Sequence, residues 1–289
     1  MRAPLNVLSI NSENSIDNSN GTNGLLGLVS EAKPDVLFVP ETSKLGSNQP
    51  IEEWHSPEFE AFAAEMIRLG YGDALFTDYY TSARDRPNQT IMSMFTRGDN
   101  AIRRIEVGNR YALLTTIGGV AVMGVHADDN NEVNRIQTAE AITRELELYD
   151  SAVIMGDFNA MHRRSIGSQA LRLLSWPMSA LERRLFPDIA SYYDEANSSS
   201  IKMASLAVRL TGMADGSSLQ IYEKAGFKEQ LPLNHPTIRF GGHGLPIPGG
   251  LPIDHILARG ESVELIEAGV LPVEFSDHNA VIARFALAS

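Results

Sequence analysis

Short apolar runs recur along this chain, separated by turns rich in polar residues, glycine and proline. Runs of about four to eight apolar or alternating residues are typical of strands that bury one or both faces. We therefore predict strands at residues 5–10, 35–39, 90–95, 111–117, 120–125, 152–155, 253–258 and 280–287.

Three other segments carry apolar residues at the three- and four-residue spacing of an amphipathic helix. Residues 22–32 end just before Pro34, and residues 58–69 are closed by Gly70, both of which are usual helix stop signals. The third and longest segment covers residues 132–149. We predict a helix at each.

The predicted elements follow the order strand, helix, strand, helix, a meander of strands, then helix and strand. Neither a strict alternation of strands and helices nor an all-β protein fits this order. The pattern favours an α+β fold in which two mixed sheets pack on each other with helices outside. A chain of 289 residues can bury one large core, so we predict a single domain over residues 1–289.

One segment stands apart from this pattern. Residues 167–227 combine apolar residues with scattered arginine and lysine, which predicts helices inserted between strands, over about 163–227 in all. The basic residues make this insertion the candidate substrate-facing element, with Arg163 and Arg164 as candidate substrate contacts, although a solvated helical face explains the same charges. Residues 240–251 form a loop rich in glycine and proline.

Composition narrows the possible chemistry. The chain has no cysteine, so disulfides and cysteine-bound zinc are excluded, and any metal is held by oxygen or imidazole. No apolar run is long enough to span a membrane, the N-terminal run is too short for a signal peptide, and we expect a cytoplasmic protein. A net charge of −12 disfavours binding to a polyanion but is compatible with a local basic patch or an acidic metal site.

Acidic, amide and imidazole side chains stand at the ends of most predicted strands. They are Asn11, Glu41, His126, Asp157, Asn159, Asp254, Asp277 and His278. Strand ends at one edge of a sandwich converge in space although they lie far apart in sequence. Metal-assisted phosphoryl transfer needs such a set, because oxygen ligands hold the cation and a base activates water.

Each of these residues also has a simpler interpretation. Asn11 and Asn159 could close turns after strands, and a lone histidine such as His126 is more often structural than catalytic. Asp254 is harder to explain in this way, because a carboxylate between apolar residues is costly unless it is paired. A serine hydrolase is disfavoured, since the sequence has no Gly-x-Ser-x-Gly motif beside the string 276–278.

The order of the motifs is more specific than any one of them. They are SINSE (9–13), PDVLFVPET (34–42), NQTIMSMFTR (88–97), GVHADDN (124–130), GDFNA (156–160), PIDHIL (252–257) and SDHNAV (276–281). In this order, and over residues 5–287, the chain resembles the endonuclease/exonuclease/phosphatase superfamily. The resemblance implies the deoxyribonuclease I-like fold, a four-layer α/β/β/α sandwich of two mixed, mainly antiparallel sheets flanked by helices.

The resemblance also implies a divalent cation, Mg²⁺ or Mn²⁺. Glu41 would be its principal ligand, with Asn11 close by and Asp277 as a second carboxylate. Glu13 falls where some nucleases of the superfamily place a further acid.

The catalytic roles come from the resemblance as well. Asp157 and Asn159 would orient the attacking water and the phosphate. Asp254 would hold the imidazole of His278, which would act as the general base. His126 would contact the phosphate or assist the leaving group.

Two departures from the usual motifs bear on the subgroup. Pro40 stands where a glutamine commonly precedes the glutamate, and the segment after GDFN lacks the acidic pattern of abasic-site endonucleases. We therefore predict a metal-dependent phosphodiesterase, first of all a nuclease, outside the DNA-repair subgroup. A phosphatase or phosphodiesterase for a small or lipid phosphoester is the first alternative. An inactive binding module is the second, although it would be expected to have lost some of the strand-end groups.

Overall fold

The protein is described by a computed structural model in which residues 3–13, 16, 18–45, 57–72, 75–78, 89–108, 110–129, 131–165, 168–169, 213–238 and 250–288 are placed. These residues form two sheets of six strands each. The first sheet has the spatial order β11 (Val263–Leu271), β12 (Ala280–Leu287), β1 (Leu5–Ser9), β2 (Val36–Leu45), β4 (Gln89–Thr96) and β3 (Leu75–Asp78). The second has the order β5 (Ile102–Val107), β6 (Arg110–Ile117), β7 (Val120–His126), β8 (Ala152–Asp157), β10 (Asp254–Arg259) and β9 (Lys228–Glu229).

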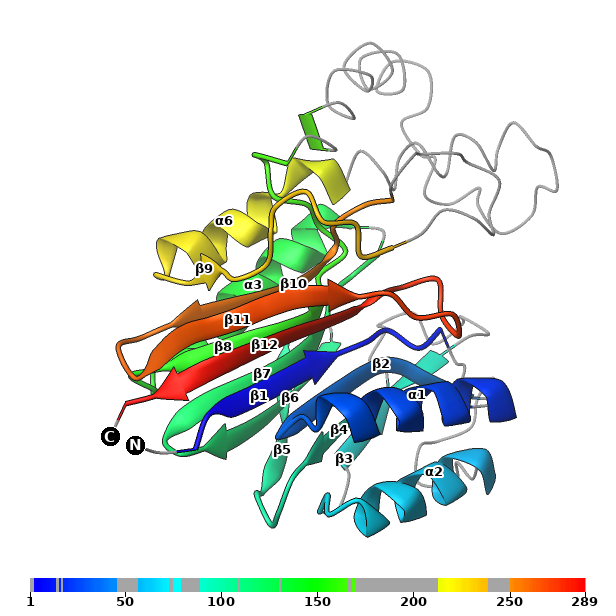
Figure 1. The fold of residues 1–289 in the computed structure, drawn as a ribbon. Helices are drawn as coiled ribbons and strands as arrows, with labels where there is room; N and C mark the ends of the chain where they lie inside the picture. The colour runs from blue at the N-terminus through cyan, green and yellow to red at the C-terminus, as the bar shows by residue number, and fades with distance from the viewer. Residues whose placement is uncertain are drawn as a thin grey trace, which may run out of the picture.

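The two sheets face each other, and helices cover their outer sides (Figure 1). Helices α1 (Ser19–Ala32) and α2 (Pro57–Arg68) pack on the first sheet. Helices α3 (Glu132–Leu146) and α6 (Ser217–Lys224) pack on the second. A third apolar core lies between the sheets. The predicted four-layer α/β/β/α sandwich is therefore confirmed.

Local sequence explains where the first helix begins and ends. The side chain of Asn18 accepts a hydrogen bond from the main-chain N–H of Gly21 (2.9 Å), which caps the first turn. The helix therefore begins before Thr22, the start predicted from the apolar pattern. It ends where Lys33 adopts a left-handed conformation (φ 47°), one residue before Pro34.

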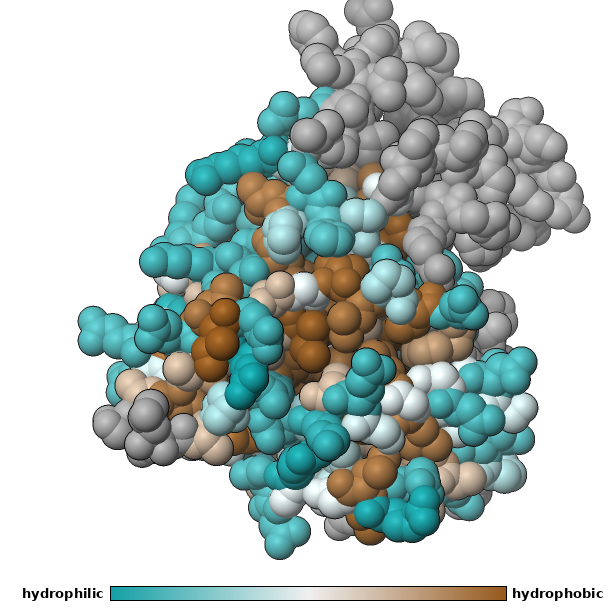
Figure 2. Space-filling model, viewed as in Figure 1, coloured by the Kyte–Doolittle hydropathy of each residue, from teal (hydrophilic) through white to brown (hydrophobic). Residues whose placement is uncertain are grey.

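Four strands were not predicted: β3, β5, β9 and β11. All four lie at or next to the sheet edges in sequence regions with weak apolar patterns, and β9 has only two residues. The side chains of β11 are largely exposed, including the apolar Leu265 and Ile266. On the face of the molecule seen in Figure 2, apolar side chains gather across the middle, between the hydrophilic surfaces of α6 and α1. In β5 and β11 many of the side chains that pack on the cores are only partly buried, which leaves a weak periodic signal in the sequence.

Of the predicted helical insertion, the structure describes residues 163–165 and 168–169 near its start and residues 213–227 at its end. There, residues 213–215 form a helical turn that is followed by α6. Residues 170–212 lie outside the described residues, and so do residues 239–249, which include most of the predicted glycine- and proline-rich loop. No helix among the described residues is long and apolar enough to cross a membrane.

Strand direction brings the predicted site residues together. Strand β1 runs parallel to β2, and β7 runs parallel to β8. The antiparallel partners β12 and β10 begin where β1 and β8 end. The carboxyl ends of β1, β2, β7 and β8 therefore lie at the same edge of the sandwich as the amino ends of β10 and β12.

Candidate active site

The centre of the site is a row of three residues on neighbouring strands. Asp157, the last residue of β8, is the register partner of His126 on β7 and of Asp254 on β10. All three side chains are buried. Asp157 and Asp254, which lie 97 positions apart in sequence, are thus placed side by side by strand pairing alone.

Glycine at position 156 is required by this packing. Its φ is +140°, and a Cβ there would lie 2.0 Å from the carbonyl oxygen of Val125. A Cβ would also lie 3.0 Å from the ring of Phe38, which enters from the opposite sheet. Gly156 therefore lets Phe38 approach β8 closely, and this contact sets the distance between the sheets next to Asp157.

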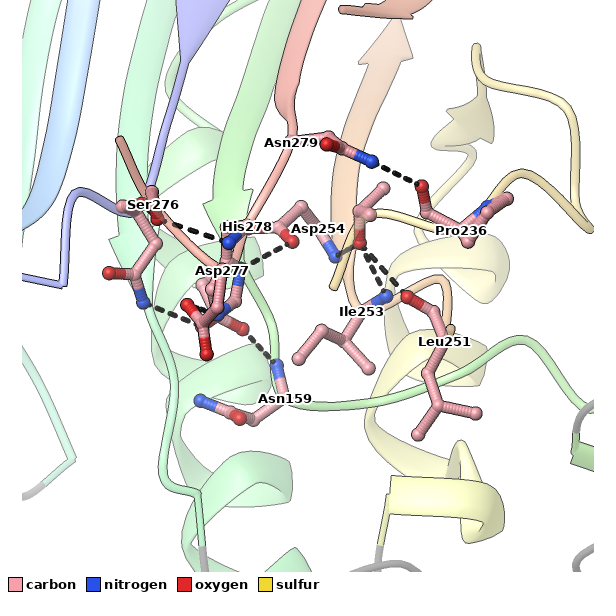
Figure 3. Close-up of polar contacts among 12 residues, drawn as sticks. Asn159, Pro236, Leu251, Ile253, Asp254, Ser276, Asp277, His278 and Asn279 are labelled. Atoms are coloured by element: carbon pink, nitrogen blue, oxygen red, sulfur yellow. Dashed lines mark hydrogen bonds and ion pairs between the residues drawn. The ribbon is translucent and has the colours of Figure 1, made fainter. Parts of the chain in front are cut away.

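The residue pair Asp254 and His278 joins the two sheets at the site (Figure 3). Nδ1 of His278 donates to Oδ2 of Asp254 over 2.8 Å, and both side chains are buried. The carboxylate that the sequence places between apolar residues is thus paired. The hydrogen bond leaves Nε2 of His278 directed toward Asp157 and Asp277, with 3.9 Å to the nearest oxygen of each.

The hydroxyl of Thr237 holds Asp254 in place. It accepts hydrogen bonds from the main-chain N–H groups of Ile253 (3.0 Å) and Asp254 (2.9 Å). The carbonyl of Thr237 accepts from the N–H of Asn279 over 2.6 Å, so the same residue also ties down the segment that carries His278. Figure 3 shows these contacts around Asp254.

Ser276 links the same segment to the first strand. Its hydroxyl donates to the carbonyl oxygen of Asn11 over 2.7 Å and accepts from the main-chain N–H of His278 over 3.0 Å. The segment that follows β1 and the segment that precedes β12 are therefore held together by the buried side chain of Ser276.

Asn11 links the carboxylates of Glu41 and Asp157. Its side-chain amide donates to Oε1 of Glu41 (3.3 Å) and to Oδ2 of Asp157 (3.1 Å). Its Oδ1 accepts from the main-chain N–H of Glu13 over 3.0 Å. Glu13 itself has a left-handed conformation (φ 48°) and is exposed at the rim of this group.

Glu41 lies at an irregularity of β2. Its φ is +51°, and the pairing of β2 with β4 shifts register between Val39 and Ser43. The hydroxyl of Ser12 donates to the carbonyl of Glu41 over 2.8 Å and supports the irregular backbone. Such bulges redirect side chains at the ends of strands, and this one brings the carboxylate of Glu41 to Asn11.

His126 lies on the second sheet, beside Asp157 and opposite Glu41 of the first sheet. Its Nε2 lies 3.5 Å from Oε1 of Glu41 and 3.8 Å from Oδ2 of Asp157. Burial holds the pKa of His126 well below its usual value, and the positive charges of Arg110 and His278 act in the same direction. The imidazole of His126 is therefore neutral.

Arg110, which was not predicted as a site residue, contacts the main chain of His126. Its guanidinium donates to the carbonyl of His126 over 3.3 Å and lies 3.4 Å from the carboxylate of Asp128. Burial lowers the pKa of Arg110 to about 10, against the opposing effect of Asp128 and Asp129. The group still carries its charge at neutral pH.

Asn159 turns the chain at the end of the GDFN motif. Its φ is +47°, its main-chain N–H donates to Oδ1 of Asp157 over 2.8 Å, and its side-chain amide donates to the carbonyl of Ala127 over 3.1 Å. Asp157 is thereby held on both carboxylate oxygens, by Asn159 on one and by Asn11 on the other.

The site concentrates negative charge in a buried place. Burial raises the pKa of Glu41, and Asp129 and Asp277 raise it further, against the effect of Asn11 and His278. Burial and the charge of Asp254 raise the pKa of Asp157.

The imidazole of His278 responds to the same charges in the opposite sense. Burial alone would lower its pKa, but the charge and hydrogen bond of Asp254, with Asp157 and Asp277, raise it to about 10. Several carboxylates thus share the positive charge of one imidazole. This excess of negative groups is typical of the ligands of a cation site.

The donor set fits a hard divalent cation. Oδ1 of Asp277 is buried and has no hydrogen-bond partner among the described residues, and it faces the site 3.9 Å from His278. Together with the carboxylate of Glu41 it offers the oxygen ligands that Mg²⁺ and Mn²⁺ prefer. Asn11 lies next to this set, but in the structure it turns its amide N–H₂ group, not its oxygen, toward Glu41.

The two predicted substrate contacts lie outside this group. Arg163 binds the residues before α6: its guanidinium donates to the carbonyl oxygen of Asp215 (2.6 Å), to the Asp215 carboxylate (2.8 Å) and to the hydroxyl of Ser217 (2.5 Å). Arg164 is exposed. The geometry thus gives Arg163 a place in holding the chain around α6.

Two further residues of the site were not singled out from sequence. Thr237 lies in a loop with no motif, and only its hydrogen bonds to Ile253 and Asp254 reveal its place. Ser276 belongs to the closing motif, two residues before His278. A serine at this spacing can accept the main-chain N–H two residues later, and in the structure it does so.

Comparison with known proteins adds a family match. The model described as the Endonuclease/Exonuclease/phosphatase family matches residues 5–278. No curated protein sequence matches the chain.

Solved structures show the same fold at low sequence identity. The 3'-5' exonuclease from Neisseria meningitidis has a TM-score of 0.60 and 15% identity, over 98% of this chain and 100% of that one. An AP endonuclease from Archaeoglobus fulgidus has a TM-score of 0.58 and 15% identity, over 97% and 99%. The human Nocturnin catalytic domain with bound sulfate anion has a TM-score of 0.52 and 16% identity, over 99% and 94%. At these identities the similarity establishes the fold.

Proposed function

Because the chain belongs to the endonuclease/exonuclease/phosphatase family and is thus a phosphoester hydrolase, we propose that it is a phosphodiesterase dependent on a divalent cation. The observation that carries the proposal is the arrangement of Glu41, Asp157 and His278 around Asn11 at one edge of the sandwich. Carboxylates, an amide and a paired imidazole are the groups that hydrolysis of a phosphoester by water needs.

The cation is Mg²⁺ or Mn²⁺ in this proposal, with Glu41 and Asp277 as its carboxylate ligands and Asn11 and Glu13 beside them. When bound, it supplies positive charge that neutralises these carboxylates and stabilises the negative charge that develops on the phosphate. The orphaned carboxylate oxygen of Asp277 and the raised pKa of Glu41 support this assignment.

His278 is the general base in this mechanism. Its Nδ1–H is held by Asp254, so that Nε2 is the atom that takes a proton from the attacking water. The imidazole must be neutral for this step, whereas the surrounding carboxylates favour the imidazolium. The base therefore becomes effective once the negative charge around it is compensated.

Asp157 and Asn159 orient the water and the phosphate. The carboxylate of Asp157 is held by Asn11 and by the main chain of Asn159, so its position is fixed before a substrate binds. His126 lies across from His278 on the other side of Asp157 and is assigned to the phosphate or the leaving group.

Hydrolysis of bis-p-nitrophenyl phosphate tests the proposal directly. We expect turnover with Mg²⁺ or Mn²⁺, no turnover in EDTA, and loss of turnover in Asp157→Ala. Glu261→Gln, an exposed acid in the turn between β10 and β11, is the matched control and should keep full activity. Turnover that is unaffected by EDTA, or that persists in Asp157→Ala, would contradict the proposal.

A nucleic acid is the first substrate class to be tested, and a small or lipid phosphoester is the second. The net charge of −12 favours the second, and the internal ion pair of Arg163 with Asp215 leaves it less available to a polyanion. Salt dependence distinguishes the two classes, since binding of a polyanion weakens steeply with salt and binding of a small phosphoester weakens little. A cytoplasmic location, predicted from the cysteine-free sequence, remains a prediction.

A further inference from the structure

A second group of ionisable side chains lies on the outer face of the second sheet, in the layer that α6 covers. It consists of His162 from the loop after β8, Glu229 from β9 and His255 from β10. His255 follows Asp254 in sequence, but neighbouring residues of a strand point to opposite faces. His255 packs edge-on against Phe158 of the outer core, away from the catalytic groups between the sheets.

One carboxylate oxygen faces both imidazoles. Oε2 of Glu229 lies 2.6 Å from Nδ1 of His255 and 3.1 Å from Nε2 of His162. The other oxygen, Oε1, accepts the main-chain N–H groups of Gln230 and Leu231, each over 3.0 Å. Glu229 is therefore an ordered carboxylate whose remaining oxygen is aimed at the two rings.

The far nitrogen of each ring faces an acceptor. Nε2 of His255 lies 2.7 Å from the carbonyl oxygen of Ala160, to which only an N–H can donate. Nδ1 of His162 lies 3.3 Å from Oε1 of Glu223. These partners permit the neutral tautomers in which the inward nitrogens of both rings carry lone pairs. In the metal-free protein, against the effect of burial, the charge and hydrogen bond of Glu229 raise the pKa of His255 and favour a proton on its inward nitrogen.

With those tautomers three ligand atoms converge on one buried point, where a divalent cation can take the place of the protons that otherwise join Oε2 of Glu229 to the two rings. Side chains of metal-binding histidines commonly donate their outer N–H to a carbonyl or a carboxylate in this way. From this convergence we propose that His162, Glu229 and His255 form a second metal site, separate from the catalytic one, for a divalent transition metal of the zinc class.

The ligand set agrees with zinc and not with magnesium. Two imidazole nitrogens and one carboxylate oxygen suit Zn²⁺, whereas Mg²⁺ prefers oxygen alone. Zinc bonds of about 2.0 to 2.2 Å at tetrahedral angles separate the ligand atoms by roughly 3.3 Å. Oε2 of Glu229, now 2.6 Å from Nδ1 of His255 and 3.1 Å from Nε2 of His162, would move about 0.7 Å from the first and about 0.2 Å from the second, and water would complete the coordination. The charge of Zn²⁺ is balanced by Glu229 and Glu223.

Such a metal would add a further link among β9, β10 and the loop after β8. His162 belongs to the loop that carries Asn159, His255 to the strand that begins with Asp254, and Glu229 to β9. Zinc at this place stabilises the outer layer next to the active site and takes no part in the reaction itself.

Metal analysis tests the site. Zinc can also occupy the catalytic carboxylates, so every protein in the comparison carries Glu41→Gln, which removes the principal ligand proposed for the catalytic cation. After dialysis against a Mg²⁺ buffer, we expect about one zinc ion per chain in the parent and at least a tenfold lower content in the parent with Glu229→Gln. His235→Gln, at an exposed histidine outside the cluster, is the matched control and should retain the zinc.

Glu229→Gln also preserves the fold in the absence of metal. The new amide keeps an oxygen for the N–H groups of Gln230 and Leu231 and turns N–H donors toward the lone pairs of His162 and His255. Equal zinc contents with and without this substitution would overturn the proposal.

A second measurement needs no change in the cluster. In the Glu41→Gln protein, Zn²⁺ should raise the melting temperature, and Co²⁺ should give the visible absorption of a tetrahedral site. The same amount of Mg²⁺ should do neither. No shift with Zn²⁺ and no such absorption with Co²⁺ would mean that His162, Glu229 and His255 are joined by hydrogen bonds alone, and the proposal would be wrong.

Discussion

The imidazole of His278 and the carboxylate of Asp254 are hydrogen-bonded over 2.8 Å across the boundary between the two sheets. Asp254 begins β10 of the second sheet, and His278 precedes β12 of the first. The orientation of the proposed base therefore depends on how the two sheets pack, as well as on either residue.

Replacing Asp254 by asparagine tests this pair. The substitution removes the charge that favours the imidazolium and lets an N–H₂ donor compete with the remaining oxygen for Nδ1 of His278, so we expect kcat to fall roughly 10²- to 10⁴-fold. Because the pKa of His278 also falls, the rise of activity with pH should move to lower pH. Steady-state kinetics over a pH series measures both effects. An unchanged pH profile would show that His278 does not titrate as the base.

The same imidazole makes the stability of the metal-free protein depend on pH. Its pKa is raised from 6.5 to about 10 in the folded protein, so between these values the folded state holds a proton that the unfolded state has lost. The stabilisation is complete below pH 6.5 and is lost as the pH rises to about 10, at up to about 1.4 kcal/mol per pH unit.

Urea unfolding in EDTA at several pH values in this window measures the slope. In His278→Gln the contribution should be absent, so the free energy of unfolding should fall less with pH than in the wild type. Parallel pH dependences for the two proteins would contradict the assignment.

Cation binding should stabilise the protein through Glu41. The carboxylate is buried with a raised pKa, and a bound cation relieves the repulsion from Asp129 and Asp277. Mg²⁺ at about 100 times its Kd stabilises by about 2.7 kcal/mol, a rise in melting temperature of roughly 5 °C or more. Differential scanning calorimetry should detect this rise in the wild type and in Glu261→Gln, but not in Glu41→Gln. A full Mg²⁺ shift in Glu41→Gln would place the cation elsewhere.

Gly156 should not tolerate a side chain. In Gly156→Ala the new methyl group meets the carbonyl of Val125 and the ring of Phe38, at a φ of +140°. We expect a loss of roughly 3 kcal/mol or more in unfolding free energy. The control is Gly27→Ala in α1, where a Cβ meets nothing within 4 Å, with a gain of roughly 0.5 to 1 kcal/mol. Chemical denaturation compares the two variants, and equal stabilities would refute the packing argument.

Thr237 should act on catalysis through Asp254. Thr237→Val keeps the shape but leaves the N–H groups of Ile253 and Asp254 without their acceptor, at a cost of roughly 1 to 3 kcal/mol. We expect kcat to fall while KM changes little, because Asp254 no longer holds His278 in one orientation.

Thr115→Val is the control for Thr237→Val. Thr115 lies on β6, away from the site, and its buried hydroxyl donates to the carbonyl of Ala101. Removing this hydroxyl should lower stability without lowering kcat. If both variants lose the same activity, Thr237 has no positioning role.

Much of the fold was predictable because buried strands and amphipathic helices have strong periodic signals. The strands of the two sheet interiors and helices α1, α2 and α3 were predicted, and the family motifs implied the four layers. Edge strands such as β5 and β11 were missed, since half-exposed side chains follow no clear period. The ends of helices shifted by a few residues where a cap such as Asn18 decides the boundary.

The sequence by itself determined which groups are available: strand-end carboxylates, amides and imidazoles, no thiol, and a glycine where a strand must be approached closely. Only the tertiary structure decided which of them meet. Asp157 and Asp254 become neighbours through strand register, Asp254 and His278 through the packing of one sheet on the other. Thr237 and Glu229 gain their places in the same way. The physical reason is that local periodicity records burial, whereas contacts between distant segments depend on register and packing, which no single segment encodes.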